Sequence, residues 1–422
     1  MSLSDISIKF NEKTLNEIIA KYSGTKCTGW RFVGGFKKGD SYLSQVFRLQ
    51  IDGQRGKDTI QINTIIKSIP KNVGRRKTFR SADFFRNEIH FYERTMKACL
   101  QHQDKMTLND MAVRDKVFNG VPRCISSFSD GENDFIVLED LGGEGYSTVS
   151  RHTGMDLNHC IMAMQILGRF HAVSLAYRFQ KPQEFEASVL PFVEETYNDD
   201  KFYDWYKKLQ GDLIATALDA VEKEYAGTEI EAKAKSFLTN NLFKKIVQCT
   251  HETNKYSVLC QGDCWTPNFL FKYRDDGSIP IGVKMIDFQL ARFASPATDI
   301  SFFIYSCTTQ DLREKHYDDL LKSYHMSLAD QLKVYGLNVG DVFPYQALLE
   351  ELKERACFGI GMGIESIPFS VMEDDEAGDL DKIEGEEAVD VTTVWIIRPI
   401  KNKEGRLRLA EIFKHAVQMG YI

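Results

Sequence analysis

The chain has 422 residues, of which 43% are apolar, and its formal net charge is -7. This length and apolar content predict a folded protein with one large core or two moderate ones, and two lobes fit the length better. The negative charge argues against nucleic-acid binding, because neutralising phosphates requires clustered Lys and Arg. We therefore expect a small molecule as the partner.

The amino terminus, residues 1–22, lacks the apolar core of a signal peptide, and no run elsewhere approaches the roughly 18 apolar residues of a spanning helix. Nine cysteines are scattered without CxxC pairs, which fits reduced thiols better than a disulfide framework or a zinc cluster. These features predict a cytoplasmic protein without a membrane segment or a structural metal. They leave the oligomeric state open.

Two segments in the first part of the chain alternate with period two. In residues 41–51 and 59–69, apolar side chains recur on one parity, as in Ile60, Ile62 and Ile66. Such alternation predicts half-buried β-strands.

The pattern then changes to that of a helix beginning near Ser81, whose apolar stripe is formed by Phe85, Ile89, Tyr92 and Met96. Residues 134–141 predict a last strand that ends in a polar turn at Glu139 and Asp140. We place a domain boundary there, with an N-terminal lobe over residues 1–138 and a C-terminal lobe over residues 139–422.

Helices dominate the second lobe. They are expected over residues 155–178 and in a series from about 194 to 250, and residues 258–290 form a β-rich interruption. Residues 373–390 hold ten acidic residues against one lysine and predict a mobile, solvated loop.

Residues 33–44 are rich in glycine. Gly34, Gly35 and Gly39 allow a tight turn and a close approach of the backbone to a phosphate, because no Cβ stands in the way. The stretch neither enters a helix nor contains Gly-Lys-Ser/Thr, so it is not a Walker loop. It predicts either a kinase-type hairpin over a nucleotide or an ordinary hairpin turn.

Lys67 lies on the opposite parity to the apolar residues of its strand, and Glu88 follows 21 positions later in the predicted helix. A helix carboxylate that pairs with a phosphate-binding lysine is the arrangement of protein kinases. Glu88 stands between Phe84 and Phe91 at helical spacing, on or beside the buried face. This position favours a pair over two unrelated surface charges.

The stretch VLCQGDCWTPNFLF, residues 258–271, places Asp263 and Asn268 five positions apart between apolar runs, and Asp287 follows 19 residues after Asn268. This spacing matches a phosphotransferase catalytic loop and its metal-binding aspartate. One carboxylate orients and deprotonates the attacking hydroxyl, while a second carboxylate and an amide oxygen hold Mg²⁺ against the phosphates. The alternative is a pair of loop aspartates that cap turns.

Two other polar residues receive structural interpretations. His171 has apolar neighbours on a predicted helix and is interpreted as a packed or backbone-bonded core histidine. Asp299 stands where a helix begins, so we expect it to be an N-terminal cap.

Seven segments in chain order resemble signatures of the ecdysteroid kinase-like family, whose relatives include choline kinases and aminoglycoside phosphotransferases. They are GDSYLSQVFRL, FFRNEIHFYE, FIVLEDL, GRFHAVSL, QGDCWTPNFLF, IDFQ and SPATDISFFIYS. The resemblance implies a two-lobed, protein-kinase-like α+β fold with a small β-rich N-lobe and a larger, mainly helical C-lobe. It also implies ATP-dependent phosphorylation of a small-molecule hydroxyl, with ATP between the lobes.

By position, the resemblance implies Asp263 as the catalytic base and Asn268 and Asp287 as the Mg²⁺ ligands. The nucleotide site that it implies comprises the phosphate-holding pair, the hairpin and the adenine-binding strand end: Lys67, Glu88, Gly39, Asp40, Ser41, Glu139 and Leu141.

The sequence departs from the family two residues before the catalytic aspartate, where Gln261 replaces the usual histidine. That histidine mainly braces the loop by hydrogen bonding to nearby backbone, and a glutamine amide can also donate and accept. We therefore expect activity to survive, and a catalytically inactive small-molecule-binding homologue is the alternative.

The acceptor is expected to be a neutral, largely apolar alcohol such as a steroid or phenol, which needs apolar walls and a few hydrogen-bonding groups. The alternative is a choline- or aminoglycoside-type kinase. A quaternary ammonium needs an aromatic cage, usually with a carboxylate nearby. Residues 191–208 mix aromatics with acids, but Phe202, Trp205 and Tyr206 at helical spacing also fit a packing stripe.

Overall fold

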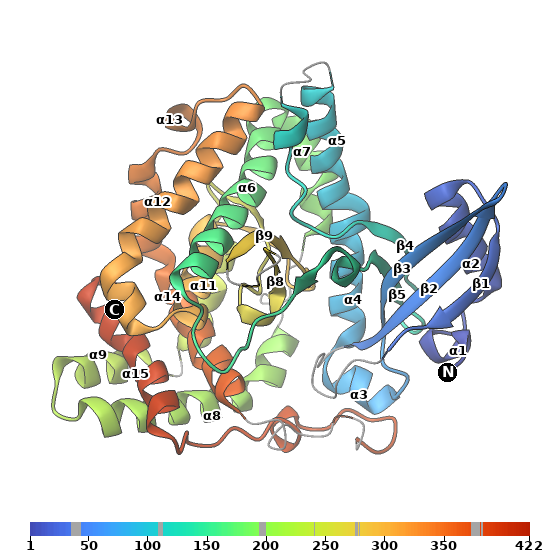
Figure 1. Ribbon diagram of the computed structural model, residues 1–422. Helices are drawn as coiled ribbons and strands as arrows, with labels where there is room; N and C mark the ends of the chain where they lie inside the picture. The colour runs from blue at the N-terminus through green and yellow to red at the C-terminus, as the bar shows by residue number, and fades with distance from the viewer. Residues whose placement is uncertain are drawn as a thin grey trace.

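The computed structural model describes residues 1–34, 44–108, 113–193, 200–239, 241–274, 277, 279–372, 380 and 383–422. Within these ranges a twisted sheet with its helices stands beside a larger, mainly helical part (Figure 1).

The smaller lobe is built on a five-stranded antiparallel sheet in the order β1-β2-β3-β5-β4. Its strands are β1 Cys27–Phe32, β2 Gln45–Arg55, β3 Asp58–Ser68, β4 Cys124–Phe128 and β5 Phe135–Glu139. Strands β2 and β3 confirm the two segments predicted from alternation.

The two faces of this sheet have different partners, as period-two alternation requires. On one face, Ile66 and Val137 join a small core with apolar residues of the first two helices. The neighbouring Ile136 and Leu138 instead belong to the large core of the protein. Lys67, adjacent to Ile66, consequently lies on the face opposite the small core.

The helices of the first 116 residues include one continuous rod formed by α4, a π-helical turn and α5. Their bounds are α1 Leu3–Ile6, α2 Glu12–Ser23, α3 Val73–Thr78, α4 Ser81–His90, η1 Phe91–Thr95, α5 Met96–Thr107 and η2 Arg114–Lys116. Helix α4 begins at Ser81, as predicted. It carries Glu88 toward β3.

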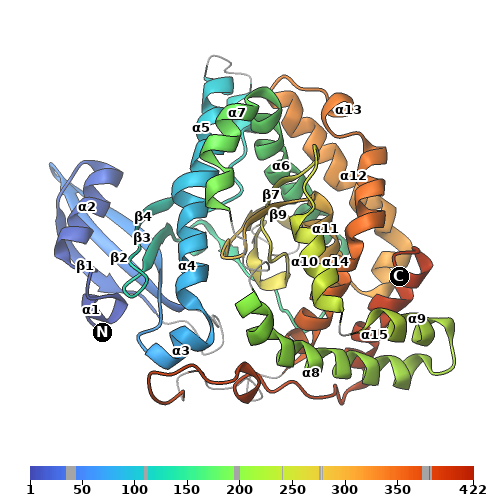
Figure 2. The same ribbon diagram turned by 180° about the vertical axis from the view of Figure 1, so that it is seen from behind.

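The larger lobe is mainly helical, and α6 packs along α12 while α11 packs along α14 (Figures 1 and 2). The bounds are α6 Leu157–Gln180, α7 Pro182–Ser188, η4 Leu190–Phe192, α8 Asp200–Tyr225, α9 Glu229–Phe237, α10 Leu242–His251, α11 Pro296–Cys307, α12 Gln310–Val334, α13 Val339–Val342, α14 Tyr345–Val371, η8 Val391–Thr393 and α15 Lys403–Gln418.

The predicted β-rich interruption at residues 258–290 is confirmed by β7, β8 and β9, which join β10 and β6 from outside that range in two small sheets, β10-β7 and β6-β8-β9. The strands of the two sheets and the short helices beside them are η3 Leu141–Glu144, β6 Tyr146–Ser147, β7 Val258–Cys260, η6 Thr266–Asn268, β8 Phe269–Tyr273, β9 Pro280–Met285 and β10 Arg292–Ala294. The predicted two-lobed, kinase-like α+β fold is thus confirmed. The boundary predicted between residues 138 and 139 falls at the end of β5, and this division of the chain stays a prediction.

Residues 383–402, which we call the strap, run along the lower edge of the molecule from α3 to α15 (Figures 1 and 2). The Asn72 Nδ2 donates to the Ile383 carbonyl at 2.7 Å, and the Val389 N–H donates to Thr78 Oγ1 at 3.0 Å. Leu380 and Ile383 are buried. The prediction that the acidic segment is solvated is therefore wrong for these residues, because their side chains pack into the core.

Helix α6 is long and apolar enough to cross a membrane, by length and composition alone. In this structure 78% of its apolar window is buried inside the protein, which accounts for the composition as that of a core helix. None of the nine cysteines takes part in a disulfide.

Candidate active site

Three charged side chains from separate elements meet where the lobes join. Lys67 Nζ lies 2.9 Å from Glu88 Oε1 and 3.1 Å from Asp287 Oδ1. Burial opposes the charge on Lys67, but the carboxylates of Asp287 and Glu88 outweigh it and raise the lysine pKa above its ordinary value. The lysine therefore stays protonated and fixed at the cavity wall.

The loop after β7 depends on a glycine. Gly262 has a φ of +87°, and a Cβ at this position would lie 1.9 Å from the Leu290 carbonyl oxygen. Only glycine fits both the left-handed backbone and the close approach. The chain turns here and presents Asp263 to the cavity.

Asp263 and Asn268 are connected directly. The Asn268 Nδ2 donates to the Asp263 carbonyl and to its Oδ2, each at 2.9 Å. Burial, together with the charge of Asp287, raises the pKa of Asp263 to about 7, although the Asn268 hydrogen bond opposes the rise. A carboxyl group in this state can take up a proton near neutral pH, as a general base must.

Asp287 has the backbone geometry of a functional residue. Its φ of 62° is in the left-handed region, which a non-glycine residue adopts at a cost. Its Oδ1 is buried and lies 3.1 Å from Lys67 Nζ, so the charge of the lysine offsets that of the carboxylate.

The side-chain oxygens of Asn268 and Asp287 fit a divalent cation. Among the described residues, both side-chain hydrogen bonds of Asn268 use its amide nitrogen, which leaves the amide oxygen available. A carboxylate and an amide oxygen are the hard oxygen ligands that Mg²⁺ prefers. Asn268 and Asp287 would therefore hold the ion.

Gln261 braces this loop with its side-chain amide. Its Nε2 donates to the carbonyls of Ile286 and Asp287, at 3.1 and 2.9 Å, and its Oε1 accepts from the Asp263 N–H at 2.7 Å. One side chain thus joins the loop of residues 261–268 to the segment that carries Asp287. This is the bracing expected of the residue that replaces histidine.

Asp299 does not cap α11, so that prediction is wrong. The cap is Ser295, whose side chain accepts from the Ala297 N–H. Asp299 lies one turn into the helix, where its carboxylate accepts from the backbone N–H groups of Gln261 and Gly262 at 2.6 and 3.0 Å. Asp299 therefore anchors the backbone of the loop at Gln261 and Gly262.

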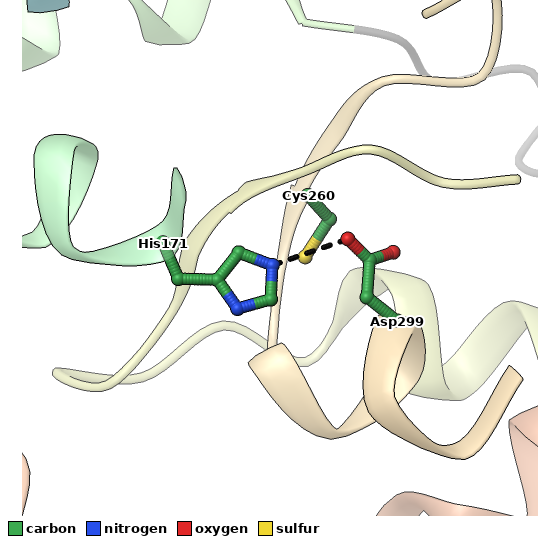
Figure 3. Close-up of side chains that lie close together, drawn as sticks. All are labelled: His171, Cys260 and Asp299. Atoms are coloured by element: carbon green, nitrogen blue, oxygen red, sulfur yellow. Dashed lines mark hydrogen bonds and ion pairs between the residues drawn. The ribbon is translucent and has the colours of Figure 1, made fainter. Parts of the chain in front are cut away.

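His171 and Cys260 lie next to Asp299, and the three could in principle surround a cation (Figure 3). Both imidazole nitrogens are already engaged, Nε2 with Asp299 at 3.1 Å and Nδ1 with the Tyr324 hydroxyl at 2.9 Å. Burial raises the pKa of the Cys260 thiol well above its ordinary value. The cluster is therefore a hydrogen-bonded brace, which agrees with the core role predicted for His171.

A cavity of about 640 Å³ contains Asp263, Asn268, Asp287 and Lys67 in its wall. Toward the sheet it is lined by Val46, Ile65, Leu138, Glu139 and Leu141. Glu139 and Leu141, which the resemblance predicts to lie beside the adenine of ATP, thus line the cavity. Three others, Gly39, Asp40 and Ser41, lie outside the described residues.

The cavity wall also contains residues that were not among the predicted site residues. They come from α8, the loop of residues 261–268, α14 and the strap and include Trp205, Tyr206, Trp265, Glu365, Phe369 and Trp395. The available signal was Glu365, the only charged residue between Ala356 and Val371. The packing stripe considered for residues 202–206 is confirmed at Tyr206, which belongs to the large core, and at Trp205, which packs against it; both also line the cavity, while the Phe202 side chain lies outside the described part of the chain.

A model of the ecdysteroid kinase-like family matches residues 38–337 of the chain. A comparison with curated proteins finds no match.

Two solved structures resemble the chain distantly. One is a GDP and kanamycin complex of APH(2")-IIia, with 14% identity, a TM-score of 0.34, and coverage of 84% of this chain and 97% of that chain. The other is the aminoglycoside phosphotransferase APH(3'')-Id from Streptomyces rimosus with ADP and streptomycin, with 13% identity, a TM-score of 0.32, and coverage of 76% and 95%.

Proposed function

The chain belongs to the ecdysteroid kinase-like family, and from this premise and the geometry of the cavity we propose that it is a MgATP-dependent kinase that phosphorylates a hydroxyl of a small molecule. The observation that carries the proposal is that Lys67, Asp263, Asn268 and Asp287 line one cavity, with Glu88 paired to Lys67 and Asn268 bonded to Asp263. A protein that only binds a ligand has no need for this set.

Each residue has a defined task in the proposed reaction. Asp263 orients the acceptor hydroxyl and accepts its proton while the hydroxyl oxygen forms a bond to the γ-phosphorus of ATP. The bond from that phosphorus to the bridging oxygen of ADP breaks, and ADP leaves. Lys67, held by Glu88, stabilises the phosphate oxygens. Mg²⁺ bound by Asn268 and Asp287 would neutralise negative charge on the phosphates.

For the acceptor, we propose a neutral, largely apolar alcohol, with ecdysteroids as first candidates and hydroxylated xenobiotics second. Trp205, Trp265 and Phe369 offer apolar surface in the cavity wall. Such walls suit a steroid or phenol, because apolar area supplies most of the affinity in a pocket of this kind. We place the reaction in the cytoplasm.

A transfer assay tests the proposal. The purified full chain is incubated with MgATP and a panel of steroid, phenol, glycoside and amino-alcohol acceptors, and products are detected by the mass gain of one phosphoryl group. We expect phosphorylated steroid or phenol in the presence of Mg²⁺. Phosphorylation of choline or ethanolamine alone would contradict the acceptor class, and no phosphorylated product in any arm would contradict the enzyme.

A further inference from the structure

Part of the cavity wall, which we call the aromatic chamber, is formed by Trp205, Tyr206, Phe369 and Trp395. Trp205 and Tyr206 stack with their ring centroids 6.3 Å apart. Trp395 of the strap packs against Phe369 of α14 and against Phe79, with centroid distances of 5.4 and 4.9 Å. The chamber is therefore assembled from α8, α14 and the strap together with a residue that follows α3.

One carboxyl group opens into this chamber. Glu365 lies on the face of α14 that also presents Met362, Ser366 and Phe369 to the cavity, as the i, i+3 and i+4 spacing of a helix requires. The Tyr206 hydroxyl donates to Glu365 Oε2. Glu365 is half-buried, so part of it faces the cavity.

The electrostatic setting of Glu365 is unusual for a structural residue. Burial raises its pKa, only the Tyr206 hydrogen bond opposes the rise, and no ion pair includes Glu365 within the described part of the chain. Its charge also contributes to raising the pKa of Asp263, so the two carboxyl groups interact electrostatically across the cavity that both line. A carboxyl group placed in an apolar chamber without a cation costs stability unless something binds to it.

We propose that Glu365, oriented by Tyr206, is a specificity-determining residue that accepts a hydrogen bond from a second donor group of the acceptor while the reacting hydroxyl lies at Asp263. This inference rests on the proposed function and narrows its substrate class. The acceptor has an apolar body, one hydroxyl to be phosphorylated, and a further O–H or N–H donor. Anionic acceptors are disfavoured, because the carboxyl groups of Asp263 and Glu365 line the same cavity.

The test uses matched acceptors that differ only in the second donor: a steroid or phenolic diol, its mono-methyl ether, and the analogue with an amine in place of the second hydroxyl. Binding is measured by calorimetry, and kcat/KM by phosphoryl transfer, for the wild type and for Glu365→Leu, Glu365→Gln and Tyr206→Phe. We expect the wild type to prefer the diol or the amine over the ether by about 10- to 100-fold, as for a hydrogen bond to a charged group.

In Glu365→Leu this preference should disappear while the affinity for MgATP is unchanged. Glu365→Gln separates the two donor chemistries: it should keep most of the preference for a hydroxyl, since the amide oxygen still accepts, and lose the preference for an ammonium group. Tyr206→Phe keeps the ring and should reduce the preference partially. The last two variants preserve side-chain size, so they remain informative if Glu365→Leu does not fold.

Two different results would overturn two different parts of the proposal, the role of Glu365 and the kinase reaction. Equal discrimination between diol and ether in the wild type and in every Glu365 variant would overturn the role of Glu365, even if phosphoryl transfer is efficient. Donor-dependent binding that is lost in the variants, without phosphoryl transfer by the wild type, would instead uphold the subsite and overturn the proposed kinase reaction.

Discussion

At the scale of single residues, the loop of the proposed catalytic base is held by hydrogen bonds on both sides of Asp263. Asn268 donates to the Asp263 side chain, and Gln261 accepts from its backbone N–H. Asp299 accepts from the two N–H groups that precede it. The position of the carboxylate is therefore fixed by the protein and does not depend on the substrate.

We predict that Asp263→Ala lowers turnover by roughly 10²- to 10⁴-fold, the usual contribution of a positioned general base. The affinity for MgATP should stay close to that of the wild type, because the proposed nucleotide contacts come from other residues. Steady-state kinetics and nucleotide titration measure the two effects separately. Turnover near the wild-type rate would remove Asp263 from the mechanism.

For Gln261 we predict that a change to histidine alters kcat by less than about tenfold, since an imidazole also donates and accepts. Gln261→Leu is the matched control: it removes the hydrogen bonds to Ile286, Asp287 and Asp263 and should lower kcat markedly. A gain of several orders of magnitude in Gln261→His would mean that the natural protein is a crippled enzyme.

The sequence predicted some site residues well and others not at all, for physical reasons. Lys67 and Glu88 were identifiable because strand parity and helical spacing are local properties. The pairing of Tyr206 with Glu365 joins residues 159 positions apart. Such a contact depends on how helices pack, and no local pattern encodes it.

At the scale of elements, α15 contributes a buried histidine to the helical lobe. His415 is 3% exposed, and its Nδ1 lies 3.1 Å from the Tyr305 hydroxyl of α11. Burial, with a smaller effect of the Arg313 charge, lowers the His415 pKa to about 3. The folded protein thus keeps this imidazole neutral at pH values where an unfolded chain protonates it.

The sign of the pH effect follows from linkage. Below an unfolded-state pKa of about 6.5, the unfolded state binds a proton that the folded state refuses, so stability falls as the pH drops from 6.5 toward 3. Between about pH 7.5 and 5.5, we predict that the free energy of unfolding falls about 1 kcal/mol more in the wild type than in His415→Gln.

Denaturant titrations at the two pH values measure this difference. Tyr305→Phe is the control: it removes the hydrogen-bond partner but keeps the buried imidazole, so it should retain the wild-type pH dependence at a lower overall stability. Equal pH dependence in the wild type and in His415→Gln would show that the histidine does not contribute to it.

Element positions were predictable where one residue pattern dominates. The strands at residues 45–55 and 58–68 and the helix beginning at Ser81 follow from periodicity alone. The role of Asp299 was missed because an acid in the first turn of a helix can either cap that helix or anchor a neighbouring loop, and the sequence does not distinguish the two roles. The prediction of a solvated loop was wrong at Leu380 and Ile383, which are buried. It was made from the average composition of the segment, and an average does not reveal single apolar residues that pack into the core.

At the scale of the whole molecule, the site and the strap both join the two lobes. Lys67 and Glu88 come from the smaller lobe, and Asp287 from the larger. The strap returns from the larger lobe to α3 through Asn72 and Thr78. Occupation of the cavity should therefore stabilise the whole chain and not one lobe alone.

We predict that saturating MgATP raises the melting temperature of the wild type, since a ligand at 100 times its Kd adds about 2.7 kcal/mol to stability. In Asp287→Asn the Mg²⁺-dependent part of this rise should be lost, because the hard anionic ligand is gone. Asp341→Asn, at an exposed aspartate of α13, is the control and should behave like the wild type. An unchanged Mg²⁺ effect in Asp287→Asn would exclude Asp287 as a metal ligand.

The most direct measurement of the central claim follows the γ-phosphoryl group itself. ATP labelled in its γ-phosphoryl group is supplied with Mg²⁺ and an apolar diol, and the label is traced by mass spectrometry in the wild type and in Asp263→Ala. The account predicts one labelled phosphoryl group on an acceptor oxygen for each ADP formed by the wild type, and almost none in the variant. Label that appears only in inorganic phosphate, or acceptor phosphorylation that persists in Asp263→Ala, would contradict it.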